Sequence, residues 1–108
     1  MNPHSRGRAQ RPHSKCLQLC AQVEHALLFA LGESNDPILL DLVLDGVEPL
    51  HGDGHLLVRF VDPAGHGIAA ALAALDRARG FLRAAVADAI ARRRVPQLSF
   101  TVVPGGAR

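Results

Sequence analysis

The chain has 108 residues, 48% of them hydrophobic, which is enough for one folded domain with its own core. No run of about 18 apolar residues occurs, and no apolar core with a cleavage site follows the basic N-terminus, so we predict no membrane span, no signal peptide and a cytoplasmic location. Residues 1–15 carry four bases and no acid, residues 16–76 nine acids and one base, and residues 77–108 seven arginines and one acid. The basic ends indicate either phosphate-binding surfaces or solvated helix faces.

The N-terminal third of the chain is predicted to hold a tail and one helix. Residues 1–14 are polar, basic and interrupted by proline and glycine, which is typical of a flexible tail. From about Lys15 to Leu31 the apolar residues recur with helical spacing, and Ser14 is the expected N-cap. Cys16 and Cys20 share one face of this helix, and because the chain lacks paired Cys-x-x-Cys spacing we predict buried thiols and no metal.

The middle of the chain is predicted to form a β-hairpin. After the turn at Asn35-Asp36-Pro37, apolar and polar residues alternate from Ile38 to Glu48, and we expect Pro49 to end this strand. A second alternating run covers residues 56–61. The short connection between the two runs predicts antiparallel pairing.

The C-terminal third is predicted to hold a bent helix and a last strand. Apolar residues keep helical spacing from about residue 67 to 94, and Gly80 in Ala78-Arg79-Gly80 marks the expected bend, because glycine in a helix costs about 1 kcal/mol relative to alanine. Pro96 prevents continuation, and residues 98–103 alternate as a strand.

These elements predict an α+β fold in which the helices cover one face of a three-stranded sheet. The order is helix, strand, strand, helix, bend, helix, strand. The expected buried face consists of Leu40, Leu42, Leu44, Leu56, Val58, Phe60, Leu98, Phe100 and Val102.

The arginines near the bend are the leading candidates for ligand contacts. Arg77, Arg79 and Arg83 would meet nucleic-acid phosphates there, helped by the backbone amides at the start of the second helix. We expect Gly80→Val to strain the bend and to damage folding and binding. The whole candidate RNA-binding set is Arg77, Ala78, Arg79, Gly80, Arg83, Arg92, Arg93, Arg94, Lys15 and Arg11.

Catalytic chemistry is not predicted. His51, Asp53 and His55 lie in a glycine-rich loop that could bind a metal or exchange protons, but no nucleophile or third ligand accompanies them. We therefore expect a protein that is not an enzyme and has no cofactor.

Three motifs resemble the ribosome-binding factor A family of bacterial small-subunit maturation factors. The first is Asn35-Asp36-Pro37 followed by Val47-Glu48-Pro49, the second is the segment 71–83 around Ala78-Arg79-Gly80, and the third is Arg94-Val95-Pro96-Gln97-Leu98-Ser99-Phe100. The resemblance covers about residues 15 to 103.

The resemblance implies a type II KH-like domain whose Ala-x-Gly kink replaces the Gly-x-x-Gly loop of RNA-binding relatives. It implies binding to the small ribosomal subunit and its rRNA in late maturation, with a part in rRNA processing. We expect the protein to be a monomer. The expected organisation is a basic tail at 1–14, the domain at 15–104 and a short end at 105–108. The alternative function is a protein-interaction domain whose acidic hairpin docks a basic partner.

Overall fold

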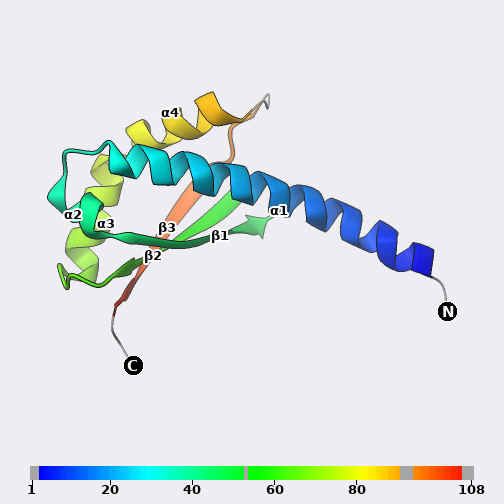
Figure 1. The fold of residues 1–108 in the computed structure, drawn as a ribbon, viewed down its shortest axis with the longest axis horizontal. Helices are drawn as coiled ribbons and strands as arrows, with labels where there is room; N and C mark the ends of the chain where they lie inside the picture. The colour runs from blue at the N-terminus through cyan, green and yellow to red at the C-terminus, as the bar shows by residue number, and fades with distance from the viewer. Residues whose placement is uncertain (1–2, 53, 91–93, 106–108) are drawn as a thin grey trace.

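The fold comes from a computed structural model that describes residues 3–52, 54–90 and 94–105. Figure 1 shows a long N-terminal helix crossing over a small sheet and extending past it at its N-terminal end. In chain order the elements are α1 (Pro3–Gly32), α2 (Pro37–Asp41), β1 (Val43–His51), β2 (His55–Asp62), α3 (Ile68–Arg77), α4 (Arg79–Ala89) and β3 (Gln97–Pro104).

The three strands form one sheet in the order β1-β2-β3. β1 pairs antiparallel with β2, which confirms the predicted hairpin, and Leu44 lies opposite Phe60. β3 pairs parallel with β2, and Phe100 lies opposite Val58. A parallel pair needs a crossover connection, which α3 and α4 provide.

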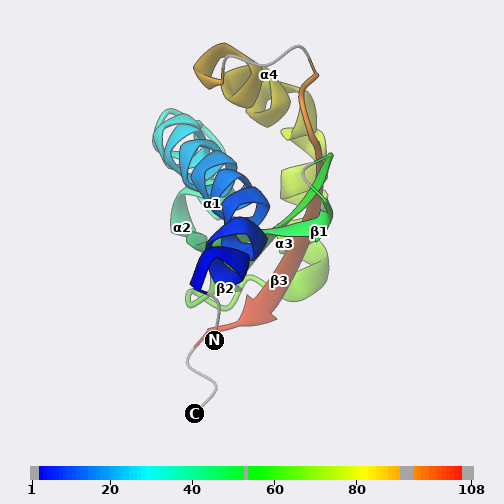
Figure 2. The same ribbon diagram turned by 90° about the vertical axis from the view of Figure 1, so that its right-hand side faces the viewer.

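One face of the sheet is buried under the helices. Burial alternates along β2, so that Leu56, Val58, Phe60 and Asp62 are enclosed and their neighbours are half-buried. α1 packs on β1, α3 packs on β3, and α1 packs on α4. The view nearly along α1 in Figure 2 shows α4 at the top, next to α1. The α+β architecture predicted from the sequence is therefore confirmed.

The predicted first strand begins later than expected. The Asp36 carboxylate accepts a hydrogen bond of 2.9 Å from the Ile38 N–H, and Pro37 occupies the first helical position, so the segment starts α2. As a result Leu39 is buried, whereas Leu40, expected in the sheet face, is 51% exposed. The prediction for Leu40 was wrong because a cap and a proline outweighed the alternation of side chains.

β1 also continues through Pro49 to His51. Proline is tolerated there because β1 is an edge strand, and the register shifts between Pro49 and His51. The prediction that Pro49 ends the strand was wrong.

α1 begins before its predicted start. Its backbone is helical from Pro3, so neither Pro12 nor Ser14 marks its beginning. The expected helix start at Lys15 was wrong, while the flexibility of residues 1–14 stays a prediction. Within α1 Cys20 is buried and Cys16 half-buried, and burial raises the pKa of the Cys20 thiol.

Asp62 fixes the loop that leads from β2 into α3. Its carboxylate accepts hydrogen bonds from the Gly67 N–H at 2.8 Å and the His66 N–H at 3.2 Å, and the bond from Gly67 is the main reason that its pKa lies below the usual value. Gly67 has φ of 103°, a conformation that favours glycine. The loop fixes the start of α3, and it thereby sets the position of Arg77 at the end of that helix.

Candidate nucleic-acid interface

The helix is interrupted at a single residue, Ala78. α3 ends at Arg77, α4 begins at Arg79, and Ala78 between them has φ −91° and ψ 3°. Ala78 is half-buried against the core, and its carbonyl accepts the first hydrogen bond of α4 from Leu82 at 2.9 Å. The predicted break lies within the Ala-Arg-Gly motif, but at its alanine rather than at Gly80.

Gly80 lies in the first turn of α4, where the structure leaves room for a side chain. Its φ is not positive, and a Cβ built there meets nothing within 4 Å outside the backbone of its own helix. We therefore expect Gly80→Ala to stabilise the fold by about 0.5–1 kcal/mol, because alanine loses less backbone entropy in a helix. Urea unfolding measures this, and a loss of stability would show a constraint at Gly80. The earlier expectation of strain from Gly80→Val lacks a basis, since the space is open.

Arg77 lies at the end of α3 on the surface. Its side chain is 64% exposed, and one guanidinium nitrogen lies 3.4 Å from the carboxylate of Asp36, the residue that caps α2. A long ion pair at the surface contributes little to stability. Arg77 can therefore turn toward an external anion at small cost.

The guanidinium of Arg79 is held in place by contacts within the protein. Its guanidinium donates a 2.8 Å hydrogen bond to the Leu98 carbonyl on β3, lies 4.7 Å from the centre of the Phe100 ring, and pairs with Asp76 at 3.3 Å. Phe100 in turn contacts the ring of Phe60, with centroids 6.1 Å apart. Arg79 thus connects the start of α4 to the edge strand of the sheet, a role that the sequence did not reveal.

A small polar cleft lies beside Arg79. It has a volume of about 220 Å³, and its lining residues come from the beginnings of β2, β3 and α4. His55 Nε2 and Ser99 Oγ are 2.6 Å apart across the β2–β3 pair. The residues that line the cleft are His55, Arg79, Arg83, Gln97, Leu98 and Ser99.

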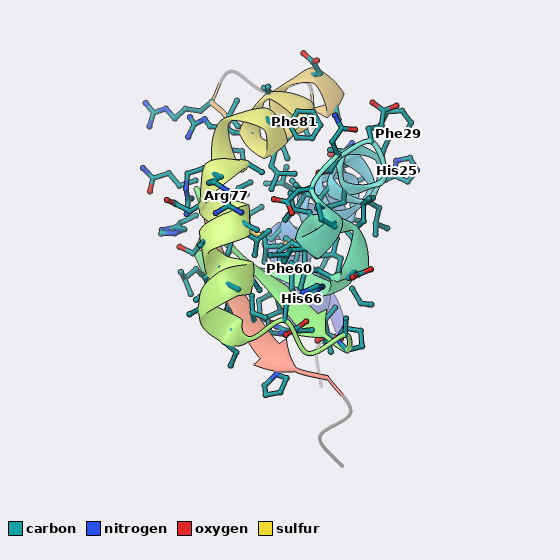
Figure 3. The ribbon with its side chains drawn as sticks, turned by 90° about the vertical axis from the view of Figure 1, so that its left-hand side faces the viewer. His25, Phe29, Phe60, His66, Arg77 and Phe81 are labelled. Atoms are coloured by element: carbon teal, nitrogen blue, oxygen red, sulfur yellow. The ribbon has the colours of Figure 1, made fainter. Side chains whose placement is uncertain are left out.

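Arg83 is the second cation that lines this cleft, and its side chain is exposed. It lies one turn after Arg79 on α4, and its side chain makes no ion pair with another described residue. Figure 3 shows the helix break from the side of α3, with Arg77 on the face of that helix turned to the viewer. A cleft with guanidinium, hydroxyl and amide donors suits an anionic ligand such as a phosphate.

Comparison with solved structures gives a close match. The crystal structure of ribosome-binding factor A from Thermus thermophilus has a TM-score of 0.70 and 32% sequence identity to this chain, and the match covers 85% of this chain and 97% of that one. The chain belongs to the ribosome-binding factor A family. The resemblance inferred from the three motifs is thereby confirmed. Comparison with protein-family models and with curated proteins gives no match.

In this member of the ribosome-binding factor A family, part of the candidate set is brought together and part is not. Arg77, Arg79 and Arg83 lie around the break, and Arg94 is exposed before β3. Arg92 and Arg93 lie outside the described residues. The backbone at Arg11 and Lys15 belongs to the N-terminal half of α1, which extends away from the break (Figure 1).

The sequence analysis missed three polar residues of the cleft: His55, Gln97 and Ser99. The sequence analysis considered His55 only for metal binding or proton exchange, in the loop before β2. The parallel register of β2 and β3 brings these residues together, because it pairs His55 with Gln97 and Leu57 with Ser99. That register cannot be read from the sequence of either strand alone.

The described residues hold neither a metal-binding cluster nor a membrane-spanning helix. Among the described residues, His, Cys, Asp and Glu form no group of three or more that could hold a metal ion. Over the same part of the chain, no helix combines the length and the apolar character that crossing a bilayer requires.

Proposed function

We propose that this protein binds the small ribosomal subunit in the cytoplasm through its rRNA and acts as a monomer in late subunit maturation, including rRNA processing. The observation that carries the proposal is the likeness to ribosome-binding factor A from Thermus thermophilus, at 32% identity over 97% of that chain. The proposed role is binding without catalysis and without a cofactor.

The surface around the helix break supports this function. From residue 77 onward the described part of the chain carries four arginines, Arg77, Arg79, Arg83 and Arg94, against a single acid, Asp88. Arg77 and Arg83 contact phosphates in our proposal, and Arg79 keeps the cleft in shape through Leu98 and Phe100. Such contacts position a protein on RNA without reading its bases.

The acidic hairpin is a weaker candidate for the binding surface. Arg59 of β2 lies 2.5 Å from Glu48 and 3.4 Å from Asp45 of β1, and the hydrogen bond to Glu48 raises the pKa of the Arg59 guanidinium. Two of the hairpin's carboxylates are therefore already paired within the chain. A basic partner would have to compete with Arg59 for both of them.

Co-sedimentation with purified ribosomal subunits at several salt concentrations tests the proposed function. We expect binding to small subunits and not to large ones. The logarithm of the affinity should fall with the logarithm of the salt concentration with a slope of about −1.5 to −2 for the two phosphate contacts of Arg77 and Arg83. Equal binding to both subunits, or binding that salt does not weaken, would contradict the proposal.

A further inference from the structure

A second concave surface lies between α1 and α4, in a part of the fold that the arginines do not line. It is a groove of about 480 Å³ whose lining is mostly apolar. Small side chains from both helices, including Ala26, Ala30 and Ala85, leave room between them. Figure 3 shows Phe81 on α4 and Phe29 and His25 on α1 in this part of the molecule.

The two phenylalanines of the groove are exposed, in contrast to the phenylalanine at the centre of the core. Phe29 is 67% exposed and Phe81 48% exposed, whereas Phe60 in the core is completely buried. Exposed aromatic rings that gather at one groove are typical of a binding site for another protein. Neither ring belongs to the buried core cluster, so burial in the core does not explain them.

The charged residues at the groove are acidic. They lie at the carboxyl ends of α1 and α4, where the helix dipole is also negative. Glu33 directly follows α1, and Asp88 is in the last turn of α4. The carboxyl end of a helix carries partial negative charge, so a carboxylate there is unfavourable unless a cation is near. Neither acid forms an ion pair with a described residue, and none of the residues lining the groove is lysine or arginine.

The two acids lie at opposite ends of the groove. α1 and α4 run in opposite directions (Figure 1), so the end of α4 lies beside the middle of α1, where His25 and Ala89 line a common hollow. Glu33 belongs to the other end, with the start of α4. Phe81 and Asp88 are seven positions apart, which is about two helical turns.

We propose that the groove between α1 and α4 docks a basic amphipathic helix of a partner protein. Its apolar face covers Phe29 and Phe81, and its lysines or arginines, two to three turns apart, pair with Glu33 and Asp88. Helix-in-groove recognition of this kind uses apolar anchors at helical spacing. The proposal goes beyond RNA binding, because the groove and the arginine cleft share no lining residue.

Titration with a synthetic helix tests the proposal. The probe is a peptide of about 15 residues with leucines at helical spacing and lysines at both ends, and its matched control has glutamate in place of lysine. We expect the basic peptide to bind at least about tenfold more tightly than the acidic one. In NMR spectra of the labelled protein, the shifted amides should belong to α1 and α4 around the groove.

Variants of the protein separate the groove from other surfaces. The double variant Glu33→Gln/Asp88→Asn should bind the basic peptide about tenfold more weakly, while Glu24→Gln, which removes a charge outside the groove, changes affinity less than about twofold. Phe29→Ser should weaken binding as well. Leu17→Ser is its control and should not weaken binding, because it also replaces an exposed apolar side chain of α1 by serine but lies outside the groove. Small-subunit binding should be unchanged in all four variants.

Three results would overturn the proposal. The first is that the basic and acidic peptides bind equally. The second is that the shifted amides lie away from α1 and α4. The third is that the protein self-associates in sedimentation equilibrium and that Phe29→Ser abolishes this, because the groove would then hold a second copy of the chain.

Discussion

Replacing Phe60 by alanine is expected to lower the free energy of unfolding by about 3–5 kcal/mol. Phe60 is fully buried in the central strand, opposite Leu44 on one side and Val102 on the other. Removal of the ring leaves a cavity bounded by strands on both sides, which cannot close by a small shift of one element. Because a small domain is stable by about 5–15 kcal/mol in total, this single change removes much of the margin.

Urea unfolding followed by circular dichroism measures the effect, with Phe29→Ala as the matched control. Phe29 is 67% exposed, so its loss should change stability by less than about 0.5 kcal/mol. The midpoint should fall for Phe60→Ala with little change in slope. Equal effects of the two variants would contradict the placement of Phe60 in the core.

The strands and the core were predictable because their side chains alternate. In β2 every second residue is buried, and the sequence places Leu56, Val58 and Phe60 on that face. In β3 the sequence also places Leu98 and Val102 on the buried face, and both are buried. Phe100 between them is only half-buried: its ring contacts Phe60 in the core and also the guanidinium of Arg79.

The short helix α2 shows where alternation misleads. Residues 38–44 have the pattern of a strand, yet the first part of this segment is helical because Asp36 caps it and Pro37 fits the first turn. Both signals are visible in the sequence, but they are equally typical of a turn. A turn and the start of a short helix differ only in whether the chain continues for one more helical turn. The helix is favoured here because it packs Leu39 into the core.

The candidate site was predictable in position but not in the role of each residue. The motif Ala78-Arg79-Gly80 located the helix break to within two residues. It could not show that Arg79 would be bound to the Leu98 carbonyl, since that contact joins positions 19 residues apart through the tertiary fold. For the same reason the sequence did not indicate the groove, whose two walls come from α1 and α4.

The division between Arg79 and its neighbours leads to the last prediction. The double variant Arg77→Ala/Arg83→Ala should bind small subunits at least about tenfold more weakly, because each charged hydrogen bond to a phosphate contributes about 1.5–3 kcal/mol. The salt slope should become shallower by about one unit for each arginine removed. Both side chains are exposed, so the unfolding midpoint should not change.

Arg79→Ala should lower folding stability and leave the salt dependence of binding unchanged. This contrast with the double variant makes the prediction specific. It removes the hydrogen bond to β3 and the contact with Phe100, so we expect a loss of about 1 kcal/mol in folding stability. The salt slope of Arg79→Ala should stay close to that of the unchanged protein. Arg59→Gln serves as the control for loss of a positive charge elsewhere on the protein, since Arg59 pairs with the hairpin acids. If the double variant binds small subunits with the affinity and salt slope of Arg59→Gln, then Arg77 and Arg83 do not contact phosphates. The proposed surface at the helix break would then be wrong.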